Sequence, residues 1–328
     1  MEQLPVTATD PDAFYGALVE LLDRHGLRFE GACWHLTDPA TGLLTWTGFS
    51  GELPGDFVAA LENEYLEDDV AKYAELATRR ARVASLVDET GGQPRRSARY
   101  RRHFVPEGFA DELRFAFADG FGRWGSMGLF GETVFTEADC AAAAQLVPLV
   151  ARALREGVAT ASAPATVGAP GVMLLDSGDR VQMRDARAGE LLEGSATTGA
   201  LPGAVHVLAA QARASGAPAS GRTLAGGAWI AVDASPVIGE PGAVAVVLRP
   251  APPPSLLEVR LRAAGLTERE REIAVALLRG DDTGSIAARL HLSPWTVQDH
   301  LKAIFDKTAV RSRRAFVARW ALQSAGVA

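Results

Sequence analysis

The chain has 328 residues, of which 48% are hydrophobic and 22% are charged, and this composition excludes wholesale disorder. Because single domains cluster near ~100–150 residues, we expect two or three domains. The net charge of −7 excludes a protein that coats nucleic acid along its whole length. From Ser255 onward, however, 12 Lys and Arg stand against 8 Asp and Glu, whereas the preceding residues have 21 against 32. This asymmetry is typical of an acidic body with one module that contacts phosphate.

Two low-complexity stretches, "ATASAPATVGAP" and "RPAPPPS", divide the chain, because their residues favour linkers and resist packing. No internal repeat is evident in the sequence. We therefore expect a multidomain fold with an α+β domain at 1–158, a linker at 159–169, a small α+β domain at 170–250, a Pro-rich linker and lead-in helix at 251–262, and an all-α domain at 263–328.

The first segment alternates helical and strand-like patterns. A helix near 12–25 precedes two strands, "LRFEGACWHL" and "GLLTWTGF", whose separating "TDPATG" predicts a hairpin turn. A second helix is expected at 56–73, followed by strands in "RVASLVD", "DELRFAFAD" and "RWGSMGLFGE". Thr136 is positioned to cap a closing helix. The pattern predicts a sensor-like α+β domain.

The motifs "DPATG", "SARYRRHF", "DELRFAF", "WGSMGLF" and "FTEADC" in this segment resemble those of GAF-type domains. Such domains bind very different ligands or none, so no ligand is implied. The cluster "RRSARYRR" at 95–102 fits either a solvated face or a surface for an anionic effector or DNA. Five aromatic residues are a candidate effector pocket or simply core: Trp34, Trp46, Phe115, Phe117 and Trp124.

The middle segment starts with "GVMLLDSGDRVQMRDARAGELL", which predicts a strand, a turn, a second strand and a helix. Two further strands follow in "AWIAVDASPVI" and "GAVAVVLRP". The arrangement resembles PAS domains, which serve as sensing or dimerising modules. The Ala- and Gly-rich "GSATTGA" and "ARASGAPASG" leave little bulky material to line a pocket.

The C-terminal segment contains three consecutive helix signals. In "GLTEREREIAVALLRG", Thr267 and Glu270 form a capping box and Gly280 ends the helix. "TGSIAARL" predicts a short second helix. Ser293 caps a third helix that has Pro294 at its first position. The residues of this third helix that repeat at helical spacing and should pack inward are Val297, Leu301 and Ile304.

The opposite face of the third helix is polar and should point outward, with Trp295, Gln298, Asp299, Lys302 and Asp306. In a major groove, Gln298 can pair with adenine, Asp299 can accept from cytosine N4, and Lys302 can reach guanine or phosphate. For Trp295, a partly buried ring and a DNA contact are equally compatible with the sequence.

The motifs "LTEREREIAVALLRG", "IAARLHLSPWTVQDHL", "IFDK" and "VRSR" resemble the LuxR-type helix-turn-helix domain of bacterial transcription regulators. The resemblance implies four helices, a DNA-binding dimer that uses the third helix, and a fourth helix near 313–325 for packing and dimer contact. It also implies positions near phosphates for Ser293, Thr296, Arg311 and Ser312. Two departures, "GDDTGS" and Gln298 in place of a Lys, predict weaker phosphate attraction and a shallow salt dependence.

Other chemistries find no support in the sequence. Cys33 and Cys140 are isolated and fit small core residues, and the histidines have no metal-ligand spacing. No nucleotide-binding or phosphoacceptor motif is present. We therefore expect no cofactor, no metal and no enzymatic activity; a thiol-dependent reductase would need an exposed, low-pKa Cys.

The leading hypothesis is a dimeric, sequence-specific regulator that binds double-stranded DNA and has a sensory region for an unidentified effector. An acidic scaffold that contacts RNA polymerase or another regulator, without DNA binding of its own, is the alternative. The N-terminal "MEQLPVTATDPDAF" has no targeting pattern and no run approaches the roughly 20 apolar residues of a membrane span, so we expect a cytoplasmic protein with no membrane partner.

Overall fold

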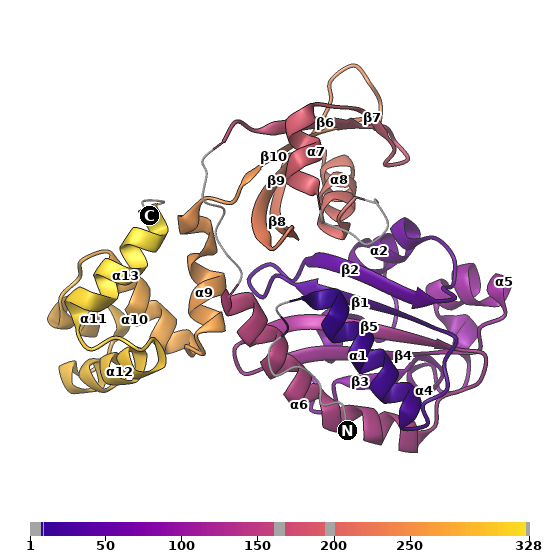
Figure 1. Ribbon diagram of the computed structural model, residues 1–328, viewed down its shortest axis with the longest axis horizontal. Helices are drawn as coiled ribbons and strands as arrows, with labels where there is room; N and C mark the ends of the chain where they lie inside the picture. Colours follow the sequence, from indigo (N-terminus) through magenta and orange to yellow (C-terminus); the bar gives the residue numbers. More distant parts are fainter. Residues whose placement is uncertain (1–7, 9, 161–167, 194–200, 326–328) are drawn as a thin grey trace.

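A computed structural model describes residues 8, 10–160, 168–193 and 201–325 of the chain (Figure 1). Most of the predicted linker at 159–169 and the whole "GSATTGA" stretch lie outside these described residues. None of the described helices combines the length and the hydropathy needed to cross a membrane.

The first domain is a five-stranded antiparallel sheet with helices on both faces. Its elements are α1 (Pro11–Arg24), β1 (Gly31–Thr37), β2 (Leu44–Gly51), α2 (Phe57–Leu66), α3 (Tyr73–Leu76), β3 (Val83–Ser85), α4 (Leu86–Glu89), η1 (Pro94–Arg96), η2 (Tyr100–Phe104), α5 (Val105–Glu107), β4 (Asp111–Asp119), β5 (Gly122–Gly131) and α6 (Glu137–Thr160). The strand order is β2-β1-β5-β4-β3. The predicted cap of α6 is confirmed, because Thr136 Oγ1 accepts from the N–H of Asp139 at 3.2 Å.

Two predictions for this domain are wrong in detail. The helix expected at 56–73 ends at Leu66, and a non-helical segment follows in which Ala71 has a φ of +53°. The strand expected in "RVASLVD" ends at Ser85, whose side chain caps the one-turn helix α4 by accepting from the N–H of Asp88 at 3.2 Å. The first break lays Ala71 and Leu76 against Ala84 and Ala116 of the sheet, and the second places Asp88 of α4 near Cys140 of α6. Both are tertiary contacts, which local periodicity does not indicate.

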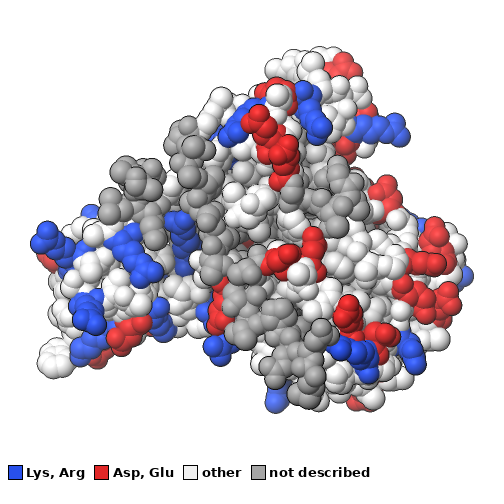
Figure 2. Space-filling model, viewed as in Figure 1, with Lys and Arg blue, Asp and Glu red and all other residues white. Residues whose placement is uncertain are grey.

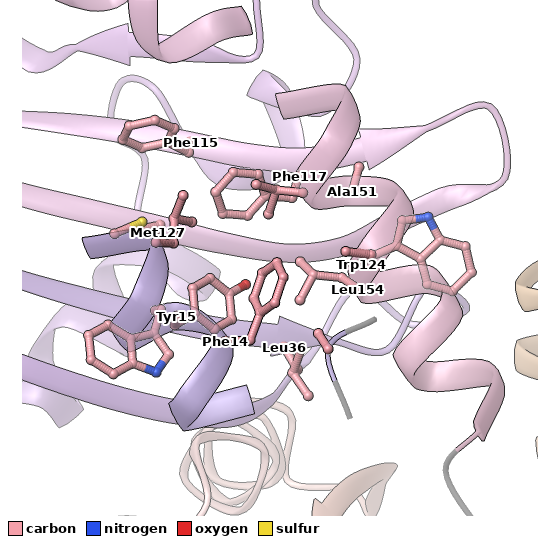
Figure 3. Packing of buried hydrophobic residues seen from close by; sticks show 14 of the residues in the cluster. Phe14, Tyr15, Leu36, Phe115, Phe117, Trp124, Met127, Ala151 and Leu154 are labelled. Carbon is pink, nitrogen blue, oxygen red and sulfur yellow. The ribbon is translucent and has the colours of Figure 1, made fainter. Parts of the chain in front are cut away.

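The two faces of this sheet are chemically different, and β4 shows the division most clearly. Leu113, Phe115 and Phe117 point toward α1 and α6, where they join the apolar core (Figure 3). Glu112 and Arg114 alternate with them and point to the other face, yet both are buried. The period of two in a strand places neighbouring residues on opposite faces, so one strand serves two different environments.

The second domain repeats the strand order of the first. Its elements are β6 (Gly171–Leu175), β7 (Val181–Arg184), α7 (Ala186–Leu192), α8 (Gly203–Ser215), β8 (Ala219–Ala225), β9 (Ala228–Pro236) and β10 (Val244–Pro250). The antiparallel order β7-β6-β10-β9-β8 corresponds strand for strand to that of the first sheet. This structural repetition has no counterpart that we detect in the sequence.

Helix α8 and strand β8 were not expected from the sequence. The helix packs on the second sheet through small residues, with Ala204, Ala209 and Ala212 fully buried. It ends at Gly216, which has a φ of +66° as a left-handed cap requires. Because Ala and Gly carry little hydrophobic signal, a sequence pattern alone does not distinguish this packed helix from a loop.

The third domain is entirely helical and contains η3 (Pro253–Leu256), α9 (Leu257–Ala263), α10 (Glu268–Leu278), α11 (Thr283–Leu290), α12 (Pro294–Lys307) and α13 (Arg313–Ala325). The predicted lead-in helix is therefore present as η3 and α9. Its core joins residues from all four of the last helices, among them Ile273, Ile286, Val297 and Phe316.

Polar contacts connect the three domains. The Arg222 guanidinium of β8 donates to the buried Asp38 carboxylate at 2.7 Å, which joins the first two domains. Arg262 of α9 donates to the Phe121 carbonyl at 2.9 Å, and Arg155 of α6 donates to the Ala263 carbonyl at 3.1 Å. The turn between β4 and β5 is therefore a docking point for the C-terminal domain.

Candidate nucleic-acid interface

Helix α10 is joined to α12 through the carboxylate of Glu270. The predicted capping box is present, since the Thr267 N–H donates to Glu270 Oε2 at 2.7 Å and the Glu270 N–H donates to Thr267 Oγ1 at 3.4 Å. Glu270 also accepts from Lys307 Nζ of α12 at 2.7 Å. Burial acts to raise the pKa of Glu270, but the hydrogen bonds from Lys307 and Thr267 hold that pKa below its usual value. One carboxylate therefore caps α10 and anchors the end of α12.

The acidic pair before α11 has a structural role. Asp282 caps the helix by accepting from the Ser285 N–H at 2.7 Å. Asp281 pairs with Arg289 at 2.6 Å, and its carbonyl accepts from Arg313 at the start of α13. These two residues replace a Lys-containing segment in the resemblance, and here they hold α11 and α13 in place.

Helix α12 has the shape expected of a reading helix. Ser293 Oγ accepts from the Thr296 N–H at 3.0 Å and lies 2.8 Å from Thr296 Oγ1, so both predicted phosphate-proximal hydroxyls also take part in the cap. The inward residues Val297, Leu301 and Ile304 are buried as predicted. In Figure 1, α12 lies along the edge of the C-terminal domain, away from the second sheet.

The outward face of α12 presents the predicted side chains to solvent. Trp295 is 79% exposed, so the partly buried alternative does not describe this indole. Gln298 Nε2 donates to Thr283 Oγ1 of α11 at 3.3 Å, and Lys302 Nζ lies 3.4 Å from Asp299 Oδ1. The Lys302 and Asp299 side chains are 72% and 68% exposed, so this ion pair is weak and free to open.

The loop before α13 and the first turn of that helix add two exposed cations. Ser312 caps α13 by accepting from the Ala315 N–H at 3.1 Å. Arg311 and Arg314 are exposed, and neither has an acidic group within salt-bridge distance in the described part of the chain. Figure 2 shows more Lys and Arg than Asp and Glu on the visible face of this domain. Sequence reasoning singled out Arg311 and missed Arg314, although the run "RSRR" contains both.

The five aromatic residues suggested for an effector pocket pack on the α1 and α6 side of the first sheet (Figure 3). Phe115 and Phe117 contact each other with ring centroids 5.8 Å apart, and Trp124 donates to Asp119 Oδ1 at 2.8 Å. Trp34 and Trp46 both direct their indole N–H groups to Asp12 Oδ1, at 3.4 and 3.2 Å. None of the five lines the cavity of this domain, which is on the opposite face of the sheet.

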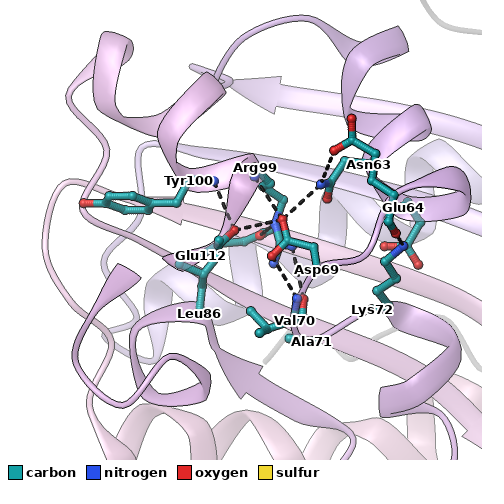
Figure 4. Close-up of polar contacts among 12 residues, drawn as sticks. Asn63, Glu64, Asp69, Val70, Ala71, Lys72, Leu86, Arg99, Tyr100 and Glu112 are labelled. Carbon is teal, nitrogen blue, oxygen red and sulfur yellow. Dashed lines mark hydrogen bonds and ion pairs between the residues drawn. The ribbon is translucent and has the colours of Figure 1, made fainter. Parts of the chain in front are cut away.

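A buried ionic network occupies that opposite face, and sequence reasoning missed it. Glu112 accepts from Arg99 Nε at 2.7 Å and from Arg114 Nε at 2.8 Å, and Arg114 also reaches Glu64 at 2.7 Å. Asp69 accepts from the Arg99 N–H at 2.9 Å (Figure 4). Burial acts to raise the pKa of Glu112, but Arg114 and Arg99 hold it below its usual value, so the carboxylate stays ionised.

The network also shows that "RRSARYRR" is not uniform. Arg95, Arg96, Arg101 and Arg102 are exposed, as a solvated face requires, whereas Arg99 is 2% exposed. The alternation of charges in "DELRFAF" could have indicated a second polar face, but a strand with one charged face ordinarily turns that face to water.

The two cysteines are not activated nucleophiles. Burial raises the pKa of Cys33 to about 12 and that of Cys140 to about 11, so both stay protonated thiols at neutral pH. Neither thiol meets the requirement of a thiol-dependent reductase.

Comparison with known proteins identifies the class of the last domain. Residues 264–320 match the family model described as "Bacterial regulatory proteins, luxR family". The C-terminal domain is therefore a LuxR-type helix-turn-helix domain.

A short stretch of the chain is also similar to a curated protein. Over 65 residues the chain is 38% identical to the probable transcriptional regulatory protein NarL of Mycobacterium tuberculosis. The match covers 19% of this chain and 30% of NarL, so the chain spans less than a third of the length of this relative.

Two solved structures show a weaker likeness. Escherichia coli SdiA is 12% identical with a TM-score of 0.31, over 94% of this chain and 89% of SdiA. The Vibrio cholera VqmA–ligand–DNA complex is 17% identical with a TM-score of 0.26, over 49% of this chain and 85% of VqmA. These scores do not establish a shared overall fold.

Proposed function

We propose that this protein is a sequence-specific, DNA-binding transcription regulator that acts as a dimer. The observation that carries the proposal is the division of α12 into a buried face that fixes its position and an exposed polar face that offers Gln298, Asp299 and Lys302 to base edges. The first domain is GAF-like and the second PAS-like in this proposal, and together they form the sensory region.

The charges around α12 support selective binding with modest affinity for random DNA. Lys302 and Lys307 each lie near a carboxylate, and Arg289 is paired with Asp281. Attraction to phosphate therefore rests mainly on Arg311 and Arg314 beside the helix. Since each phosphate contact contributes about 0.9 to the slope of log affinity against log salt, we expect a shallow slope.

Retrieval of genomic DNA fragments by the purified full-length protein tests the proposal. Lys302→Ala should reduce recovery of the enriched fragments by about 5–10-fold, corresponding to one lost contact to a base or phosphate. Arg269→Ala is a matched control, because Arg269 forms an i,i+3 pair with Glu272 on α10, as Lys302 does with Asp299 on α12. Recovery of no fragment above background, with folded protein, would favour the acidic scaffold instead.

Gln298→Lys adds a cation to the outward face of α12, whereas Lys302→Ala removes one. The added cation should raise affinity for random-sequence DNA and steepen the salt slope by up to about 0.9, while reducing the preference for the enriched fragment. Fluorescence anisotropy at several salt concentrations measures both quantities. Unchanged affinity for random DNA would mean that this face of α12 does not meet the duplex.

A further inference from the structure

On the face opposite α1 and α6, the first sheet borders a partly open cavity of about 90 Å³. This volume is well above the ~10–15 Å³ that one water molecule requires. The cavity is bounded by the sheet on one side and by α2, η2 and the loop before α2 on the other. Its apolar wall includes Phe49, Leu53, Phe57, Leu61, Phe104 and Phe130. Such a wall accommodates the hydrocarbon or aromatic part of a small molecule.

Two polar groups in the wall have unused hydrogen-bonding capacity. Arg99 and His103 both line the cavity, and they are 2% and 7% exposed. The network of Figure 4 uses Nε, Nη1 and the backbone N–H of Arg99, while Nη2 is buried with no partner. Nε2 of His103 is likewise buried without a partner. Unpaired buried polar atoms are rare because each one costs about 1–3 kcal/mol. Two of them in the wall of one cavity therefore indicate a place where a ligand can supply the missing hydrogen bond.

Arg99 and His103 belong to one short segment of the chain. Residues Tyr100–Phe104 form a single π-helical turn, and Arg99 and His103 are four positions apart across it. Single π-turns occur frequently at functional sites, where they reorient side chains. Gly55, with a φ of +69°, packs against His103 so closely that a Cβ there would lie 2.4 Å from Nδ1. The imidazole is therefore held in place from the loop side.

The charges around the cavity select among ligands. Arg99 and Arg114 are matched by the carboxylates of Glu64, Glu112 and Asp69, which leaves this cluster with one excess negative charge. A further anion would be repelled, whereas a neutral oxygen can accept from Arg99 without adding charge. Burial and Arg102 lower the pKa of His103, so its ring is neutral, and in the tautomer with the proton on Nε2 that nitrogen can donate to a ligand oxygen.

We propose that this cavity binds a small, neutral, largely apolar molecule whose carbonyl oxygen accepts a hydrogen bond from His103 Nε2, with Arg99 Nη2 as a second unpaired donor in the same wall. The site gives the sensory region of the proposed regulator a specific ligand class. It stands on the geometry of the first domain alone, and its occupancy does not require DNA binding.

Three probes of similar size test this ligand class on the full-length protein. Acetophenone has the neutral carbonyl, benzoate has a charged carboxylate, and toluene has no acceptor. Ligand-observed NMR titration should show acetophenone binding at least five-fold more tightly than toluene and at least ten-fold more tightly than benzoate. The first ratio corresponds to one net hydrogen bond and the second to a disfavoured buried charge. Toluene binding as tightly as acetophenone, or benzoate binding more tightly, would overturn the proposal.

Variants locate the binding within the cavity. His103→Phe should lower the affinity for acetophenone at least five-fold while leaving the affinity for toluene nearly unchanged. Ala60→Leu places extra volume in the cavity wall and should lower the affinity for both probes. Ala59→Leu, on the same helix but outside the wall, should leave both affinities unchanged. Equal acetophenone affinity in Ala60→Leu and Ala59→Leu, or the absence of acetophenone binding to wild type, would also overturn it. Loss of this site would leave DNA retrieval intact, so its failure is distinguishable from failure of the proposed function.

Discussion

The two sheet domains have the same strand order but are filled in opposite ways. The first contains large aromatic side chains on one face and a buried ionic network beside a cavity on the other. The second packs α8 on its sheet through alanines and aliphatic residues. Strand order therefore determines how the chain is connected, whereas the volume and charge of the side chains determine whether a cavity forms beside the sheet.

Their buried histidines differ in the same way. His35 of the first sheet forms its hydrogen bond with the neutral Thr47 Oγ1 at 3.0 Å, whereas His206 of α8 lies 3.0 Å from the Asp179 carboxylate. The first domain thus keeps a neutral imidazole next to its ionic network, and the second gives its imidazole a negative partner.

The largest effect should come from the ionic network. Glu112→Gln keeps the shape of the side chain but leaves Arg99 and Arg114 without their shared carboxylate, which should lower the free energy of unfolding by about 3–5 kcal/mol. Denaturant unfolding followed by tryptophan fluorescence measures this loss. Glu190→Gln removes an exposed pair with Arg187 in the second domain and should cost less than about 0.5 kcal/mol. Similar losses in the two variants would remove the contrast between the domains.

A smaller effect should come from overfilling the second domain. Ala209 is completely buried in α8, so Ala209→Leu should destabilise the protein by about 1–3 kcal/mol, whereas Ala214→Leu on the exposed side of the same helix should be near neutral. Thermal unfolding of the two variants compares them directly. Unchanged stability in Ala209→Leu would mean that this domain has unfilled space, and would contradict the packing difference between the two domains.

The smallest effect should be on acid stability. Burial, reinforced by Arg114, lowers the pKa of His35 to about 3, so the folded protein keeps this ring neutral. The unfolded chain binds a proton there near pH 6.5, and the stabilisation is therefore complete above pH 6.5 and is lost as the pH falls toward 3. His35→Gln should make stability less dependent on pH, by about 1 kcal/mol between pH 6.5 and 5.5. Parallel pH profiles of wild type and variant would contradict a neutral, buried His35.

The C-terminal domain was predictable from the sequence because its determinants are local. The Thr267 and Ser293 caps, Pro294 at the first helical position and the Val297, Leu301, Ile304 stripe each act within a few residues. The first hairpin and the strands β4 and β5 were predictable for the same reason. The role of Asp281 was not, since it acts through partners on α11 and α13.

The cavity of the first domain was decided only by the tertiary structure. Arg99, Glu112 and Glu64 are far apart along the chain, and each has the pattern of a solvent-facing residue until its partner is placed beside it. A buried charge is stable only when it is paired, and that pairing depends on how the strands, α2 and η2 come together. The same holds for α8, whose alanines become core only because a sheet lies beneath them. Local signals in the sequence were enough to predict α10, α11 and α12, whereas the packing of distant segments determined where the cavity forms.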